Sequence, residues 1–189
     1  SHDTYAALIG QGQRAGADLV EVYVERWRRR HLRTIDDHVE DATSALQHGA
    51  GVRLFFGTDV VYGYTNDLTD AGLGELLESL VAVRGNAGMP GAAGSPDARG
   101  RGGLHPRKLC AGPNIHTPGV PFPARDKALR LERLRELAAG ARIAPEVKQV
   151  EGRLLEWEQD VAVATSEGAI AEDRRVRTRL MAQVIASDG

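Results

Sequence analysis

The sequence predicts an α+β protein of two units, each a mainly antiparallel sheet with packed helices, joined by a long loop rich in Gly and Pro. Three observations support this. A helical apolar pattern followed by about four strand patterns occurs twice in the 189 residues. Turns that contain Gly separate neighbouring strand patterns, which is typical of antiparallel hairpins. Between the halves, residues 85–121 include 9 Gly and 6 Pro, too many for a regular element.

These patterns divide the chain into a first unit at residues 3–84, a loop or linker at 85–121 and a second unit at 122–189. A stretch without regular structure over this length is either a mobile linker or a functional loop. The sequence leaves both alternatives open.

In the first half, Asp3 is expected to cap a helix that ends at Gly16, because apolar residues between them recur at helical spacing. Short strands are then expected at residues 17–25, 30–35, 38–47 and 51–56, with a hairpin at 55–64 that turns at "FGTD". Thr69 is expected to cap a second helix, whose apolar side has the i, i+3, i+4, i+7 spacing of Leu73, Leu76, Leu77 and Leu80.

The second half repeats this order. Residues 124–142 predict a helix with one apolar side, formed by Leu131, Leu134, Ala138 and Ala141. Strands are expected at 147–159, 160–165, 168–176 and 177–187, with "TSEG" as a turn between two of them.

Charge does not favour nucleic-acid binding. The net charge is −2, and the Arg-rich run "ERWRRRHLR" is divided by strand alternation, with Arg26, Arg28 and Arg30 on one face and Trp27, Arg29 and His31 on the other. The favoured interpretation is a solvated or ion-paired sheet face. No apolar run has the length of a membrane span, and a single cysteine excludes an intrachain disulfide, so we expect a cytoplasmic protein.

The sequence contains no phosphate-binding Gly loop, no G-x-S-x-G elbow, no C-x-x-C and no pair of histidines at i, i+4. Two clusters of side chains are weaker candidates for a metal or acid/base site. The run "DDHVED" gathers Asp36, Asp37, His38, Glu40 and Asp41, but alternation sends neighbours to opposite faces, and a solvated turn is the favoured interpretation.

The second cluster is His105, Cys110 and His116 in the loop. These side chains bind borderline metals, but Pro beside them favours an open chain, and no carboxylate stands where it could activate a bound water. His31, His38 and His48 fall in or beside separate expected strands. We therefore predict no catalytic, cofactor-binding or metal-binding residue in this chain.

Taken in order, the segments resemble the TldD/PmbA family, whose members are known as modulators of DNA gyrase and as zinc metalloproteases. "GADLVEVYVE" and "GAGVRLFFGTDVVYGYTNDLT" are similar to the family's opening domain. Residues 141–189 are similar to its middle region, and "AEDRRVRTRL" is closer to the TldD branch than to the PmbA branch. The resemblance covers nearly the whole chain outside residues 85–121.

The resemblance implies that the chemistry lies elsewhere. TldD-like proteins carry an H-E-x-x-x-H motif in a C-terminal domain, where two His and a later Cys hold zinc and the Glu activates water. That motif is absent from these 189 residues. The chain is then expected to be a non-catalytic N-terminal portion, with zinc in a domain beyond it.

The resemblance also implies an assembly, either a homodimer or a heterodimer with a PmbA-type partner, around a cavity that admits unfolded peptide. An antiparallel sheet suits that role, because an open strand edge binds peptide through main-chain hydrogen bonds. Two other functions stay open, a stand-alone peptide- or protein-binding module and a nucleic-acid-associated protein. The leading interpretation expects neither a nucleic acid nor a membrane as a partner.

Overall fold

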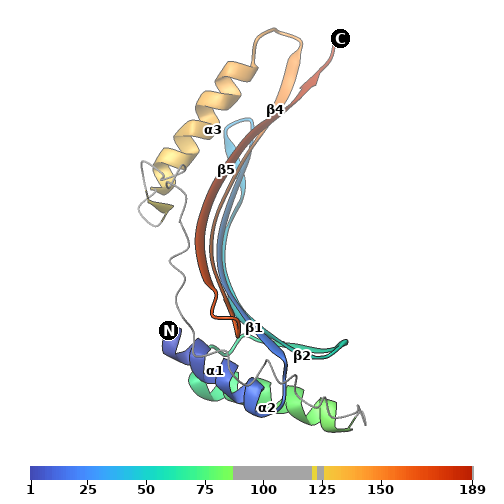
Figure 1. Cartoon of the computed structure of the whole chain (residues 1–189). Helices are drawn as coiled ribbons and strands as arrows, with labels where there is room; N and C mark the ends of the chain where they lie inside the picture. Colours follow the sequence, from blue (N-terminus) through green and yellow to red (C-terminus); the bar gives the residue numbers. More distant parts are fainter. Residues whose placement is uncertain (87–120, 123–125, 189) are drawn as a thin grey trace. The chain divides into compact units, whose positions relative to one another are not determined.

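The computed structural model describes residues 1–86, 121–122 and 126–188, so the expected loop at 85–121 lies almost wholly outside the described residues. Figure 1 shows the elements in chain order. They are α1 (His2–Arg14), β1 (Leu19–Ile35), β2 (His38–Phe56), β3 (Asp59–Thr65), α2 (Asp70–Asn86), α3 (Lys127–Ala141), β4 (Val147–Thr165) and β5 (Ile170–Ala186).

The strands form a five-stranded antiparallel sheet in the order β3-β2-β1-β4-β5. β2 and β3 pair in register from Ala50 opposite Thr65 to Phe56 opposite Asp59. The start of β1 meets the end of β4, where the amide of Ser166 donates to the carbonyl of Val20 at 2.9 Å. The predicted α+β fold class, with helices packed on an antiparallel sheet, is confirmed.

The strands are fewer and longer than the sequence patterns indicated. The two runs expected at 17–25 and 30–35 belong to the single strand β1, and β2, β4 and β5 likewise each join two expected strands. No Gly or Pro interrupts residues 26–29, and cross-strand partners satisfy the charged side chains there, so pairing continues through the Arg run.

The chain forms two compact units, and each is assembled from three segments. Unit 1 takes residues 1–26, 48–113 and 160–173, and unit 2 takes residues 27–47, 114–159 and 174–189. The sequence-based division at residues 84 and 122 stays a prediction.

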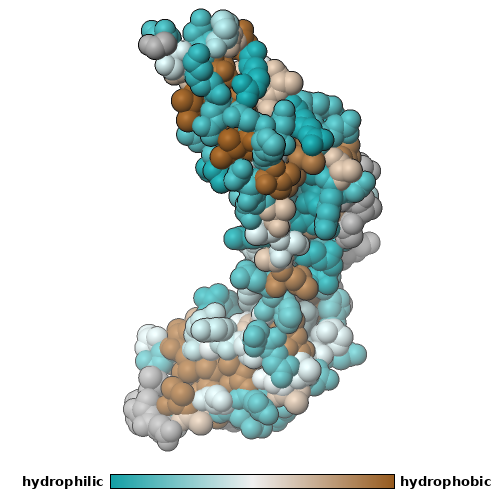
Figure 2. Space-filling model, turned by 180° about the vertical axis from the view of Figure 1, so that it is seen from behind, coloured by the Kyte–Doolittle hydropathy of each residue, from teal (hydrophilic) through white to brown (hydrophobic). Residues whose placement is uncertain are grey.

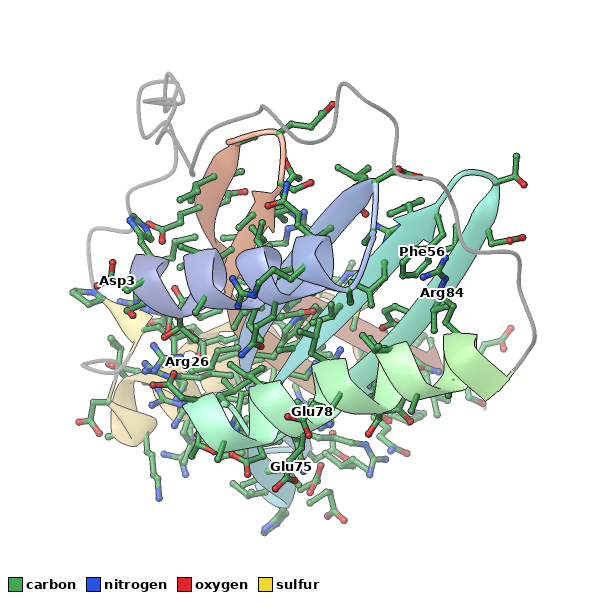
Figure 3. All side chains as sticks on the ribbon, turned by 60° about the horizontal axis from the view of Figure 1, so that its bottom comes forward. Asp3, Arg26, Phe56, Glu75, Glu78 and Arg84 are labelled. Atoms are coloured by element: carbon green, nitrogen blue, oxygen red, sulfur yellow. The ribbon has the colours of Figure 1, made fainter. Side chains whose placement is uncertain are left out.

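In unit 1, α1 and α2 lie side by side across one face of the sheet strands (Figure 3). Alternate residues of β1 and β2 face these helices, and Val20, Val52 and Leu54 are 0% exposed. The other core residues of this cluster include Leu8, Ile9, Val22, Phe56, Leu73, Leu77 and Leu80. This burial on one face leaves the opposite face of the same strands free to carry polar and aromatic side chains.

The helix ends of unit 1 follow local hydrogen bonding. Ser1 caps α1 by accepting from the amide of Thr4 at 3.3 Å, so the expected cap at Asp3 was wrong by two residues, and Asp3 lies in the first turn. Thr69 caps α2 as predicted, accepting from the amide of Gly72 at 3.1 Å.

At the other end of α2, the Arg84 guanidinium lies over the Phe56 ring at 3.8 Å and points into the unit, whereas Glu75 and Glu78 point away from it (Figure 3). An Nη atom of Arg84 also donates to the carbonyl of Ala15 at 3.4 Å. A cation over an aromatic face and a carbonyl at a helix end both stabilise this charge. Arg84 therefore ties the end of α2 to the end of α1.

In unit 2, α3 packs on the sheet through a small apolar cluster of Leu32, Leu134 and Leu154. Asp126 caps α3 by accepting from the amide of Ala128 at 3.1 Å. Phe122 is 2% exposed, and its ring lies 4.6 Å from the guanidinium of Arg30. In the part of the chain that the structure describes, no helix has the length and apolar character of a membrane span.

Two glycines of unit 1 give a matched test of this packing. A Cβ on Gly12 in α1 would lie 2.7 Å from a methyl of Val20, whereas a Cβ on Gly74 in α2 would meet nothing within 4 Å. We expect Gly12→Ala to lower the free energy of unfolding by about 1–3 kcal/mol through overpacking. Gly74→Ala should raise it by about 0.5–1 kcal/mol through helix propensity. Urea unfolding of both variants measures this, and equal effects would contradict the close contact of α1 with β1.

Candidate functional site

The first two residues of the acidic cluster "DDHVED" form the turn between β1 and β2, and the other four begin β2. Asp36 and Asp37 have positive φ angles of 45° and 69°, which Asp and Asn tolerate better than most residues. The Asp36 carboxylate accepts from the amide of Val150 at 2.9 Å and also pairs with Arg142. This carboxylate holds the turn against β4 and the end of α3. The interpretation as a solvated turn did not predict these contacts.

Among the candidates that the structure describes, one His–carboxylate pair is brought together. Nδ1 of His31 lies 2.9 Å from Oδ2 of Asp41, across β1 and β2. Within the described residues, no group of three His, Cys, Asp or Glu side chains is placed to hold a metal. The described residues therefore do not fit a zinc site. His105, Cys110 and His116 lie outside the described residues.

Ion pairs between β1 and β4 account for the Arg run. Arg26 pairs with Asp160 at 2.9 Å in unit 1, and in unit 2 Arg28 pairs with Glu158 at 3.0 Å. Arg33 pairs with Glu151 at 3.0 Å in the same unit. The ion-paired interpretation of this run is confirmed for these three residues.

Two carboxylates of unit 2 are buried on the face of β4 that α3 covers. Glu156 and Glu158 are 3% and 2% exposed. Glu158 accepts from both Arg28 and Arg174, and Glu156 lies 3.7 Å from a guanidinium nitrogen of Arg130 in α3. Buried carboxylates with arginine partners hold neighbouring elements in one arrangement. The sequence analysis did not predict these two buried carboxylates. A signal was present, because their i, i+2 spacing is the same as the spacing of Arg26, Arg28 and Arg30 on β1.

The open face of unit 1 carries exposed aromatic side chains. Val60, Tyr62 and Tyr64 alternate along one face of β3 and are 48%, 60% and 79% exposed. Tyr23 of β1 is 39% exposed, and its hydroxyl donates to Glu25 at 2.7 Å. In Figure 2 apolar surface, coloured brown, gathers on unit 1 in the lower part of the view. Exposed aromatic residues in one place are typical of binding surfaces.

Of these side chains, Tyr23 and Tyr62 line a groove of about 440 Å³, which we call the tyrosine groove. Its walls include Tyr23, Tyr62 and the ion pair of Arg53 with Glu21, whose atoms lie 2.9 Å apart. Gly51 allows the Tyr62 ring to lie close over the sheet, because a Cβ there would be 3.1 Å from the Tyr62 hydroxyl. The remaining lining residues are Val22 and Val163.

The chemistry of the tyrosine groove is that of binding. It offers aromatic rings, hydroxyls and one ion pair, which suit apolar side chains and peptide groups. Among its lining residues there is no His, Cys, Ser or Lys to act as a nucleophile or a neutral-pH base. Sequence patterns indicated the strands that carry these tyrosines but gave no sign that their side chains meet.

Two family models match this sequence. Residues 20–84 match PmbA/TldA metallopeptidase domain 1, and residues 121–189 match the PmbA/TldA metallopeptidase central domain. The chain therefore belongs to the PmbA/TldD family. Comparison with curated proteins gives no match.

Solved structures agree in fold. A protein described as a modulator of DNA gyrase from Bacteroides thetaiotaomicron matches with a TM-score of 0.74 at 14% identity, over 99% of this chain and 41% of its own. Its counterpart from Thermotoga maritima gives 0.73 at 13% identity, over 98% and 40%. TldE from Thermococcus kodakarensis gives 0.64 at 14% identity, over 98% and 40%. The chain thus spans about two fifths of the length of these proteins.

The ion pair of Glu151 with Arg33 predicts that the free energy of unfolding depends on pH. Hydrogen bonds from Arg33 and then Arg153 lower the pKa of Glu151 from 4.5 to about 2. Because the pKa is lower in the folded state, this stabilisation is complete above pH 4.5 and is lost as the pH falls toward 2.

We expect the free energy of unfolding of the wild type to fall more steeply between pH 5 and 2 than that of Glu151→Gln, as measured by urea unfolding. Glu146→Gln, an exposed carboxylate of the same unit, serves as the control and should keep the wild-type slope. An unchanged slope in Glu151→Gln would contradict the assignment.

Proposed function

We propose that this chain is a non-catalytic portion of a TldD-like zinc metallopeptidase and that it binds unfolded peptide. The tyrosine groove is the observation that carries the proposal. Two further facts support it. The matched models are the first and central domains of a metallopeptidase family, and the 189 residues contain no H-E-x-x-x-H motif.

An open sheet face with tyrosines suits a peptide without fixed structure. Tyrosine rings bind apolar side chains with little loss of side-chain entropy, and their hydroxyls accept or donate to main-chain groups. The Arg53–Glu21 pair offers both signs of charge to the same ligand. Such a groove discriminates weakly between sequences, which is what a protein that handles varied unfolded segments requires. Further contacts come from strand addition at an open edge of the sheet.

We further propose that the chain takes part in a dimer, either with a second copy or with a PmbA-type partner, in the cytoplasm. The catalytic zinc and its ligands would then belong to a domain outside these 189 residues. The family name and the likeness in fold to TldE support this assignment.

Fluorescence anisotropy with a labelled, neutral, unstructured peptide rich in Val and Phe tests the groove. We expect Tyr23→Ala combined with Tyr62→Ala to weaken binding about tenfold, since each ring contributes about 0.5–1.5 kcal/mol beyond its buried area. Ile143→Ala is the matched control, because Ile143 is an 86% exposed apolar residue of unit 2 and should leave the affinity unchanged. Equal affinity of the tyrosine variant and the wild type would remove the groove from the proposal.

A second measurement tests the non-catalytic assignment. After dialysis, we expect the 189-residue chain to retain no stoichiometric zinc and to leave an unstructured peptide intact, because hydrolytic zinc needs about three protein ligands with an open position. Stoichiometric zinc with cleavage that EDTA abolishes would overturn the assignment. His105, Cys110 and His116 would then be the first candidates for substitution.

A further inference from the structure

We propose that the outer edge of β5 in unit 2 binds an extended peptide whose residues alternate between acidic and apolar, adding it to the sheet as a further strand. This inference rests on the proposed function, since it names the edge and the class of peptide that strand addition would use. The segment concerned, which we call the arginine edge, is residues 174–186.

The position of β5 in the sheet provides the edge. β5 is the terminal strand of the order β3-β2-β1-β4-β5, with β4 on one side. Among the residues that the structure describes, no strand pairs with its other side. A terminal strand presents a row of main-chain N–H and C=O groups that an incoming strand satisfies.

The first half of one face of the arginine edge is basic, and Met181, Gln183 and Ile185 follow the arginines on that face. Arg175, Arg177 and Arg179 alternate along the strand, and all three are exposed. Arg174 contacts Glu158 on the face that α3 covers, so alternation places these three arginines on the opposite face. Residues two apart in a strand are separated by about 7 Å, so an added strand brings its own alternate side chains opposite them. Asp or Glu at those positions would pair with the guanidinium groups of Arg177 and Arg179.

The other face of the same edge begins with Arg174 and is otherwise mainly apolar. Val176, Leu180 and Val184 alternate on the side opposite to the three arginines, and Leu180 and Val184 are 45% and 42% exposed. Apolar residues at the remaining positions of an added strand would cover these side chains. The two faces together therefore define a ligand that is acidic on one face and apolar on the other.

The other long edge of unit 2 does not fit this ligand. The first part of β2, residues 38–47, lies at the opposite end of the strand order of that unit and carries Glu40 and Asp41. Like charges opposite one another destabilise a strand pair, so an acidic peptide is repelled there. Charge complementarity therefore favours the β5 edge over the β2 edge as the binding place of an acidic peptide.

A peptide fits the arginine edge better than a nucleic acid does. A phosphate backbone can pair with the arginines, but it leaves the main-chain row and the apolar face of β5 uncovered. The net charge of −2 also gives the chain no general attraction for polyanions. An acidic, strand-forming peptide uses all three features of the edge.

The probe is a fluorescein-labelled peptide in which Glu alternates with Val, and the readout is anisotropy with the 189-residue chain. Its control has the same composition, with the Glu residues placed together. Two further versions carry N-methyl groups on one or the other set of alternate amides. We expect the alternating peptide to bind, the rearranged peptide to bind at least about tenfold more weakly, and one N-methylated version to lose binding while the other keeps it, because only one set of amides faces β5.

Substitutions locate the site. Arg177→Glu combined with Arg179→Glu should weaken binding of the alternating peptide at least about tenfold, whereas Arg135→Glu, an exposed arginine of α3, should leave it unchanged. Circular dichroism and thermal unfolding check that each variant is folded. Equal binding of both N-methylated peptides, or no effect of the double substitution, would overturn strand addition at β5.

A single-stranded oligonucleotide provides the competing outcome. If it binds with the same dependence on Arg177 and Arg179 and displaces the peptide, the arginines form a phosphate site and the proposal fails. The neutral peptide used for the tyrosine groove separates this failure from that of the proposed function. Its binding should depend on Tyr62 and not on Arg177.

Discussion

The alternation of β1 determines what both faces of the sheet can hold, because β1 has a neighbouring strand on each side. In unit 1, Val20 and Val22 face the helices, and Glu21 and Tyr23 face the tyrosine groove. A shift of one residue in register would place the Glu21 side chain in the core and the Val22 side chain on the open face, which costs several kcal/mol for a buried unpaired charge. The groove therefore exists only in the register that also builds the core.

The sequence was sufficient to predict those elements whose signal is local. Apolar spacing predicted α2 with its cap at Thr69, and the turns at "FGTD" and "TSEG" predicted two hairpins. Each of these depends on residues within a few positions of one another, so composition and period are enough to find it. The α+β fold class follows from the order of such signals.

The sequence was not sufficient where residues far apart meet. The pair of Arg28 and Glu158 joins positions 130 apart, and its existence depends on the register of β1 against β4, which no local pattern gives. The long strands were missed for the same reason: charged residues stop a strand pattern in the sequence but continue it in the structure once a cross-strand partner is present. The tyrosine groove likewise draws on four strands.

The peptide binding proposed for the tyrosine groove and for the arginine edge would rest on different physical effects. The free energy gained by burying aromatic surface changes little with salt. The attraction between exposed guanidinium and carboxylate groups weakens as salt is added, and its screening length is about 8 Å at physiological ionic strength. A neutral unfolded segment is then held mainly by the groove, and an acidic one mainly by the edge at low salt. Neither surface brings a nucleophile or a metal to the bound peptide among the described residues. Under the proposed function, both surfaces select and orient a chain, and the chemistry of cleavage is supplied by a domain outside these 189 residues.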